Sequence, residues 1–455
     1  MRKSFFIFVI IIVAVLLGIH PVYAQDETVG TRLAAAHQLA LLASTLPPAP
    51  ESIIYDFVNS SMDGHYPASN LISDAAGNLY GTTERGGTTA GGTVYELSPL
   101  SGGAWTYTEL HAFHSSKTDG KNPYNGVTFD GAGNLYGTTD TGGLYGYGVV
   151  FELSPQSGGG WSYQVIHNFQ GSGFIKDGYS PKGPLAFDAA GNLYGTTFGG
   201  GTGGSCYSGG CGIVYMLSPL KTGGWVEKVI YNFLGSPDGS SPASGVVIDA
   251  SGNLYGTTTS GGTLGFGCGT FIPGCGTVFE LEHASDGGWA EGVLYAFKNN
   301  LRDGTGPSGA LIFDGAGNLY GTAPYGGVCH DSDCGAVFEL SPKSGGGWSE
   351  KVLYDFQNNG TDGLNPEGNL VFDAAGTLYG TTNLGGTHNL GSVFQLTPKS
   401  SGKWSEKVLH SFKNGTTDGQ NPTSGLAIDS SGNLYGATST GGATGGGVVF
   451  EVTPQ

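Results

Sequence analysis

The sequence predicts an all-β fold, a seven-bladed β-propeller of four-stranded antiparallel blades, closed by an N-terminal strand that completes the last blade. Three observations predict it. The phrase DAAGNLYGTT at residues 74–83 has close copies along the chain. Six of the seven copies are followed by two further strand patterns. The last copy lacks the outermost pattern, and a segment before the first copy matches it.

The copies align on one tyrosine, and their spacing of about 60 residues indicates a repeat protein. The aligned tyrosines are Tyr80, Tyr136, Tyr194, Tyr255, Tyr320, Tyr379 and Tyr435. Glycine makes up 85 of the 455 residues. A glycine content this high can signal disorder, but here the glycines recur in phase with apolar residues, which favours a folded repeat.

The fifth copy shows the four strands of one unit. Strands are expected at 310–314 and 319–322, at 336–340 and at 348–356. The residues between the first two, Gly315-Ala316-Gly317-Asn318, form a tight turn in which Asp314 caps backbone amides and Gly317 takes a positive φ. Each unit is therefore an antiparallel meander.

The fourth strand carries tryptophan, but the chain has six tryptophans for seven copies of the hairpin. The last copy stops after its third strand at 448–452, whereas residues 52–57 precede the first copy and match a fourth strand. A ring closes when both termini contribute strands to one blade, so this offset predicts a propeller. A twisted open solenoid of meanders is the alternative.

We expect a signal peptide at 1–24, a leader with a short helix and a proline-rich spacer at 25–51, and one propeller at 52–455. The expected blades span approximately 62–113, 118–169, 176–233, 237–297, 302–356, 361–412 and 417–455, the last completed by 52–57.

The phrase Asp-x-x-Gly-Asn-Leu-Tyr-Gly-Thr-Thr-x-x-Gly-Gly, followed by Gly-x-Val-Phe-Glu-Leu-x-Pro, resembles the GloVer (Gloeo/Verruco) tandem repeat of secreted bacterial proteins. The resemblance covers residues 52–455. It implies a propeller-like extracellular repeat protein and transfers no catalytic residue. Members of the family are often described by a C-terminal anchor, whereas this sequence ends at Gln455 without one.

Export is predicted by the basic start, the apolar run 5–17 and the small-residue exit at Ala24. A retained membrane anchor is the alternative for this segment, although its apolar run is short for a spanning helix. We expect a secreted or periplasmic protein with no membrane span after signal removal. The net charge of −18 argues against nucleic-acid binding. We expect a monomer whose partner is an extracellular glycan or protein.

Six cysteines form three close pairs, which in an exported protein predict disulfides. The pairs are Cys206 with Cys211, Cys268 with Cys275, and Cys329 with Cys334. A zinc site is the alternative, but a single Cys pair without a second ligand pair favours it weakly.

The loop leading into each blade, here called the leading loop, carries Asp-Gly and then proline. A ring of seven carboxylates there is a candidate Ca²⁺ site, because Ca²⁺ takes several oxygen ligands. Otherwise no cofactor is expected. The alternative is a structural turn, which sevenfold repetition favours because structure needs every copy. The aspartates are Asp63, Asp119, Asp177, Asp238, Asp303, Asp362 and Asp418.

A symmetric scaffold should carry function where its symmetry breaks. Aromatic residues absent from the consensus gather in the loops of units 2–5, and exposed rings of this kind stack on sugars or anchor proteins. Packing among the loops themselves explains them equally well. These candidate ligand-binding residues are Tyr145, Tyr147, Phe174, Phe198, Tyr207, Phe266, Phe271 and Tyr325.

Catalysis would need unrepeated acids, bases or nucleophiles. His330, Asp331 and Asp333, between two cysteines, form the densest group. No nucleophile elbow or phosphate-binding loop accompanies them. The other candidates are His65, Glu84, Arg85, Lys176 and His388.

These patterns favour a non-enzymatic recognition or scaffold propeller that binds an extracellular glycan or protein through the irregular loops of units 2–5. The alternative is a propeller enzyme, a hydrolase or lyase, acting on an extracellular carbohydrate or related metabolite. A purely architectural role is a third interpretation.

Overall fold

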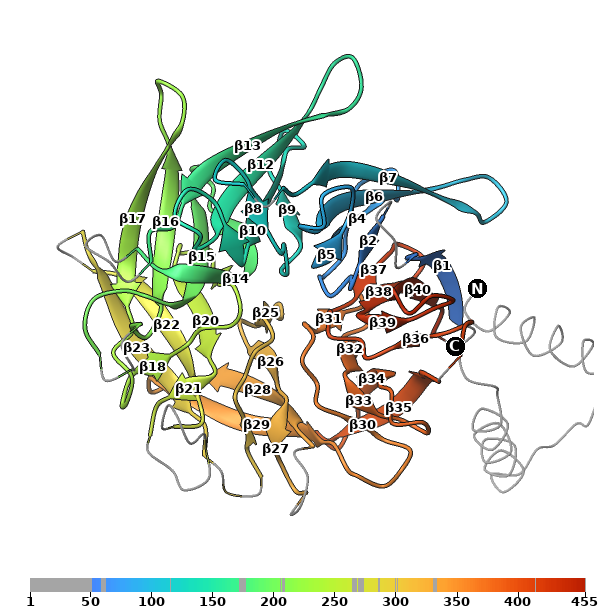
Figure 1. Ribbon diagram of the computed structural model, residues 1–455. Helices are drawn as coiled ribbons and strands as arrows, with labels where there is room; N and C mark the ends of the chain where they lie inside the picture. Colours follow the sequence, from blue (N-terminus) through green and yellow to red (C-terminus); the bar gives the residue numbers. More distant parts are fainter. Residues whose placement is uncertain are drawn as a thin grey trace, which may run out of the picture. The chain divides into compact units, whose positions relative to one another are not determined.

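Seven four-stranded antiparallel sheets surround a central axis in the computed structural model (Figure 1). The structure describes residues 51–454 except 59–62, 115, 172–176, 205, 207–208, 264–267, 269–273, 285–286, 299, 301, 330–333 and 414. The described residues belong to one unit, 49–455. The predicted signal peptide and almost all of the predicted leader fall on residues outside this description.

The sheets, read from the strand nearest the axis outward, have the following strands. The first two are β3 (Ile72–Ser73), β4 (Leu79–Thr83), β6 (Thr93–Pro99) and β7 (Trp105–Ala112), and β9 (Val127–Phe129), β10 (Leu135–Thr139), β12 (Val149–Pro155) and β13 (Trp161–Asn168). The third and fourth are β14 (Tyr179–Phe187), β15 (Leu193–Gly199), β16 (Ile213–Pro219) and β17 (Trp225–Asn232), and β19 (Val247–Ile248), β20 (Leu254–Thr258), β22 (Thr277–His283) and β23 (Trp289–Ala296).

The fifth and sixth sheets are β25 (Ile312–Phe313), β26 (Leu319–Ala323), β28 (Ala336–Pro342) and β29 (Trp348–Asp355), and β31 (Val371–Phe372), β32 (Leu378–Thr382), β34 (Ser392–Pro398) and β35 (Trp404–Ser411). The seventh is β37 (Ala427–Ile428), β38 (Leu434–Thr438), β40 (Val448–Val452) and β1 (Glu51–Asp56).

Ring closure follows the prediction. Strand β1 pairs antiparallel with β40, with Glu51 opposite Val452 and Asp56 opposite Val448. The first described strand thus supplies the outer strand of the last blade, and the two ends meet there (Figure 1). This pairing confirms the seven-bladed propeller.

The repeated phrase builds the hairpin between the first two strands. In the first blade the Asp74 carboxylate accepts hydrogen bonds from the backbone amides of Ala76 and Asn78, each at 2.9 Å. Tyr80 donates its hydroxyl to the same carboxylate at 3.2 Å. Burial alone would raise the pKa of Asp74, but these hydrogen bonds outweigh it and lower the pKa. In the fifth blade, Gly317 has the expected positive φ of 84°.

The core lies between neighbouring blades. The hairpin tyrosine of one blade contacts the outer-strand tryptophan of the next, as Tyr80 and Trp161 do at 6.3 Å between ring centroids. Phe113, at the end of the first blade, meets Phe151 of the second at 5.1 Å, and both are fully buried. Because each apolar cluster joins two blades, no blade completes its core alone.

Short two-stranded ribbons cover one face of the ring and were not predicted. Each joins the leading loop of a blade to the segment after its second strand. The ribbons are β2 (Gly64–His65) with β5 (Arg85–Gly86), β8 (Gly120–Lys121) with β11 (Thr141–Gly142), β18 (Gly239–Ser240) with β21 (Ser260–Gly261), β24 (Gly304–Thr305) with β27 (Tyr325–Gly326), β30 (Gly363–Leu364) with β33 (Leu384–Gly385), and β36 (Gly419–Gln420) with β39 (Thr440–Gly441). In the third blade the same pairing continues within β14 and β15. The ribbons hold the leading loops on this face.

Candidate functional site

The aspartate of each leading loop fixes that loop to the outer strand of the preceding blade. Asp238 accepts hydrogen bonds from the Tyr231 hydroxyl at 3.1 Å and from the Leu234 backbone amide at 2.8 Å. Asp362 accepts equivalent bonds from Tyr354 at 2.8 Å and Gln357 at 2.9 Å. We call this arrangement the aspartate latch. It ties consecutive blades together and sets where the next leading loop begins.

All seven aspartates predicted as Ca²⁺ ligands are buried, with an exposed fraction of 9% or less. His111, His167 and His410 replace the latch tyrosine at three seams, each 3.3 Å from its aspartate. Among the described residues, the group that brings three potential ligand atoms within 4.8 Å of one another is Glu51, His410 and Asp418, at one such seam. Within the described part of the chain, no such group is drawn from several of the seven aspartates. Ca²⁺ binding stays a prediction.

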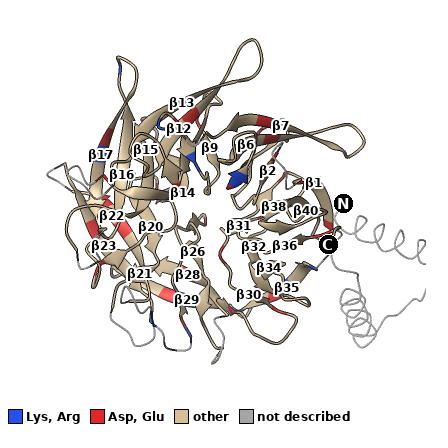
Figure 2. Cartoon of the chain, in the orientation of Figure 1, with Lys and Arg blue, Asp and Glu red and all other residues tan. Residues whose placement is uncertain are grey.

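A second side chain faces each latch from the outer strand of the following blade. In register these residues are Tyr107, Tyr163, Glu227, Glu291, Glu350, Glu406 and Glu51. Each glutamate has a buried oxygen without a hydrogen-bond partner. Burial raises the pKa of Glu406 to about 8 and that of the other four to about 7. Figure 2 shows acidic residues along the outer strands.

The residue that follows the leading-loop proline varies among the blades, with six residue types in seven positions, although the aspartate, glycine and proline of the loop repeat. These residues are Ala68, Tyr124, Lys182, Ala243, Ser308, Glu367 and Thr423. All seven line one cavity of about 710 Å³, to which every blade contributes. Because residues from the whole ring surround it, the cavity lies at the mouth of the central channel. We call these residues the variable ring.

Tyr124 and Lys182 form a fixed unit on one side of the mouth. The Lys182 ammonium donates to Asp140 at 2.7 Å and lies 5.3 Å from the centroid of the Tyr124 ring. Tyr124 is 38% exposed. Burial within the mouth raises the pKa of Tyr124 to about 12, and the negative charge of Glu367 acts in the same direction. The phenol is therefore neutral and available for hydrogen bonding at physiological pH.

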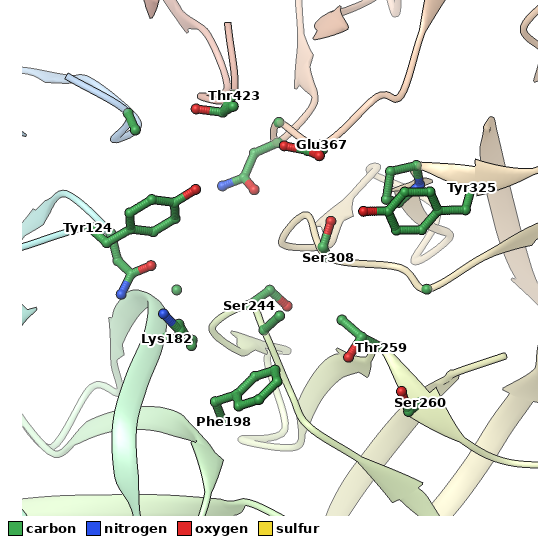
Figure 3. A pocket seen from close by; sticks show the side chains of 18 of the residues that line it. Tyr124, Lys182, Phe198, Ser244, Thr259, Ser260, Ser308, Tyr325, Glu367 and Thr423 are labelled. Carbon is green, nitrogen blue, oxygen red and sulfur yellow. The ribbon is translucent and has the colours of Figure 1, made fainter. Parts of the chain in front are cut away.

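Glu367 and a set of hydroxyl groups complete the mouth. Burial raises the pKa of Glu367, and a hydrogen bond from Asn383 opposes this effect. In Figure 3, Tyr124, Thr423, Glu367, Ser308 and Tyr325 surround the open centre of the cavity. The lining thus combines aromatic rings, hydroxyls and amides with two charged groups of opposite sign, a composition suited to a polar ligand.

The predicted aromatic residues divide into three groups. Phe198 and Tyr325 line the cavity, with exposed fractions of 38% and 44%. Tyr145 and Tyr147 are exposed at 50% and 43%, but they do not line it. The remaining four, Phe174, Tyr207, Phe266 and Phe271, lie outside the described residues.

The predicted catalytic residues are not part of the cavity where the structure describes them. Glu84 pairs with Arg85 at 3.2 Å. His65 lies on β2 opposite Arg85, and both burial and Arg85 lower its pKa. His388 Nδ1 and the neighbouring Thr387 hydroxyl form a hydrogen bond of 2.9 Å. Lys176, His330, Asp331 and Asp333 lie outside the described residues.

The three predicted disulfides are confirmed. Cys206–Cys211, Cys268–Cys275 and Cys329–Cys334 have Cα atoms 5.3, 4.9 and 5.9 Å apart. Cys268 and Cys275 border the channel-mouth cavity. Three disulfides indicate an exported protein. Within the described part of the chain, no helix has the length and apolarity needed to cross a membrane.

The variable ring was not predicted from the sequence. A signal was present, because the residues after proline belong to six types in a loop whose aspartate, glycine and proline repeat. The position after Asp-Gly varies as well, so the sequence alone does not single out the position after proline. The sequence predicted irregular, functional residues in the long loops between the second and third strands instead. Only the closed ring reveals that these seven positions share one cavity.

The fold and the channel-mouth cavity define a β-propeller with a cavity on its axis. The chain matches the Gloeobacter/Verrucomicrobia repeat three times, over residues 44–208, 160–371 and 269–455. It therefore belongs to the Gloeobacter/Verrucomicrobia repeat family, as the sequence resemblance implied. Comparison with curated proteins finds no match.

Several solved structures resemble the chain in fold. The periplasmic gluconolactonase of Pseudomonas aeruginosa is 15% identical, with 76% of this chain and 84% of that chain covered and a TM-score of 0.47. An extracellular domain from B. thetaiotaomicron, described as part of a one-component system, is 13% identical with a TM-score of 0.51. That match covers 90% of this chain and 42% of the other. A luciferin-regenerating enzyme is 13% identical, with 89% and 95% covered and a TM-score of 0.42. At these identities the likeness shows the fold alone.

Proposed function

We propose that this protein is an exported, non-enzymatic recognition propeller that binds an extracellular glycan in the mouth of its central channel. The observation that carries the proposal is the variable ring. The repeated residues of the leading loop latch and turn the backbone, whereas the residues after its proline, of six types in seven blades, all line a single cavity. A scaffold that repeats its structural residues and varies its cavity residues is suited to selective binding.

The chemistry of the lining favours a carbohydrate over an apolar ligand. Sugars present hydroxyl groups around weakly polar ring faces, so proteins bind them with aromatic rings, hydroxyls and amides. The cavity offers the rings of Tyr124, Phe198 and Tyr325 together with the amides of Asn70 and Asn369. Its volume of about 710 Å³ lies within the usual range for small-ligand sites, which suits a short segment of a glycan.

The test is binding of the oxidised protein to an array of microbial and plant polysaccharides, followed by calorimetry with the strongest ligand. We expect saturable binding that Tyr124→Ala weakens by roughly tenfold, because an aromatic contact in a binding pocket contributes about 1 kcal/mol or more. Tyr145→Ala is the matched control, since Tyr145 is an exposed tyrosine outside the cavity.

Each other outcome argues against part of the proposal. Weakening by Tyr145→Ala and not by Tyr124→Ala would place binding on the loop of the second blade instead of the channel mouth. Cleavage of the bound sugars would favour the propeller enzyme. Absence of binding to every polysaccharide would refute glycan recognition and turn the search to a protein partner.

A further inference from the structure

The two charged residues of the variable ring differ in whether their charge is compensated. Lys182 is paired, because its ammonium lies 2.7 Å from the Asp140 carboxylate. That carboxylate also accepts a hydrogen bond from the Ser180 hydroxyl, so the pair is held in place. Lys182 therefore adds little net charge to the cavity.

Glu367 has no such compensation. The ion pairs among the described residues join other carboxylates, and none brings a lysine, arginine or histidine to Glu367. Its one identified partner is the uncharged side chain of Asn383. A partly buried carboxylate without a cation carries a desolvation cost, which a cationic ligand group would offset.

The surroundings of Glu367 add to this preference for positive charge. The chain has a net charge of −18, so the field around the molecule attracts cations. The burial that raises the pKa of Glu367 would be opposed by a bound cation, which favours the ionised carboxylate.

We propose that the channel-mouth site selects saccharides that carry a free amino group, with the sugar ammonium bound to the Glu367 carboxylate across the cavity from the Lys182–Asp140 pair. The inference rests on the proposed function and names the ligand class of the same site. N-acetylation would remove the positive charge and leave Glu367 uncompensated, so acetylated sugars should bind less tightly.

The test compares three oligosaccharides of equal length and β-1,4 linkage, built from glucosamine, N-acetylglucosamine and glucose, by calorimetry near neutral pH. We expect the glucosamine oligomer to bind at least tenfold more tightly than the other two, with one site per chain. This factor corresponds to one charge-assisted hydrogen bond. Glu367→Gln should abolish the preference for the glucosamine oligomer over the glucose oligomer.

Glu84→Gln is the control for general attraction between a polycation and an acidic protein. It removes a carboxylate that is paired with Arg85 and does not line the cavity. A preference for glucosamine that persists in Glu367→Gln, or that falls equally in both variants, would overturn the assignment to Glu367. Equal or tighter binding of either uncharged oligomer would overturn the ligand class.

The two proposals fail in different ways. If other glycans bind at the channel mouth but the glucosamine oligomer does not, the selection for amino groups is wrong and glycan recognition stands. If no saccharide of any kind binds, both proposals fail.

Discussion

Replacement of Glu406 by glutamine should change how stability depends on pH. Glu406 lies on β35 and faces Asp362 and Tyr354 of the preceding seam, with one oxygen buried and without a partner. Burial raises its pKa from 4.5 to about 8, and the negative charge of Asp362 acts in the same direction. The folded protein therefore favours the protonated form of Glu406.

The sign of the effect follows from linkage. The folded-state pKa of Glu406 lies above its unfolded value. The stabilising contribution of Glu406 is therefore fully present below about pH 4.5 and is lost as the pH rises through about 8. The shift from 4.5 to about 8 corresponds to about 5 kcal/mol at about 1.4 kcal/mol per pH unit. Water entering the seam will screen the charge, so we expect half of this value or less.

Glutamine keeps the size of the side chain and does not ionise. Glu406→Gln should resemble the wild-type protein near pH 5 and be more stable than it near pH 9. The measurement is the unfolding midpoint in urea or by heating, at several pH values, with Glu282→Gln as the control because Glu282 is an exposed glutamate on β22. An equal difference between Glu406→Gln and wild type at both pH values would refute the reasoning.

Three further predictions concern the ring and its loops. Asp238→Ala should destabilise the protein by about 2–4 kcal/mol, because it removes the charged acceptor of the Tyr231 and Leu234 hydrogen bonds, and thermal unfolding measures the loss; an unchanged midpoint would contradict the latch. Replacing both Cys329 and Cys334 by serine should cost about 2 kcal/mol if chain entropy dominates for so short a loop, and should leave the circular dichroism of the blades intact. Deleting residues 51–58 should expose the edge of β40 and produce aggregation on gel filtration; a stable monomer would show that closure by β1 is dispensable.

Much of the fold could be predicted because seven copies of the repeat carry the same local turn and strand pattern. Asp314, Gly317 and Tyr320 define the hairpin by chemistry that acts over a few residues, and the structure shows the expected turn. The match of 52–57 to a fourth strand predicted the pairing of β1 with β40 in the same way.

The surroundings of the outer-strand glutamates could not be predicted from the sequence. Glu227, Glu350 and Glu406 are each followed directly by a lysine. In the structure Lys351 is exposed, but Glu350 turns into the seam toward the neighbouring blade. Strand periodicity assigns the two residues to opposite faces and cannot say that one face is covered by the next blade.

The sequence by itself determined the blade, the number of blades, the disulfides and the closing strand, because each depends on local turn chemistry, on strand periodicity or on copy number. Only the tertiary structure decided that Tyr124, Lys182 and Glu367 share one cavity. These residues come from different blades and make no local pattern with one another. Curving seven sheets around an axis brings the same position of each leading loop to one mouth, and that convergence is a property of the closed ring.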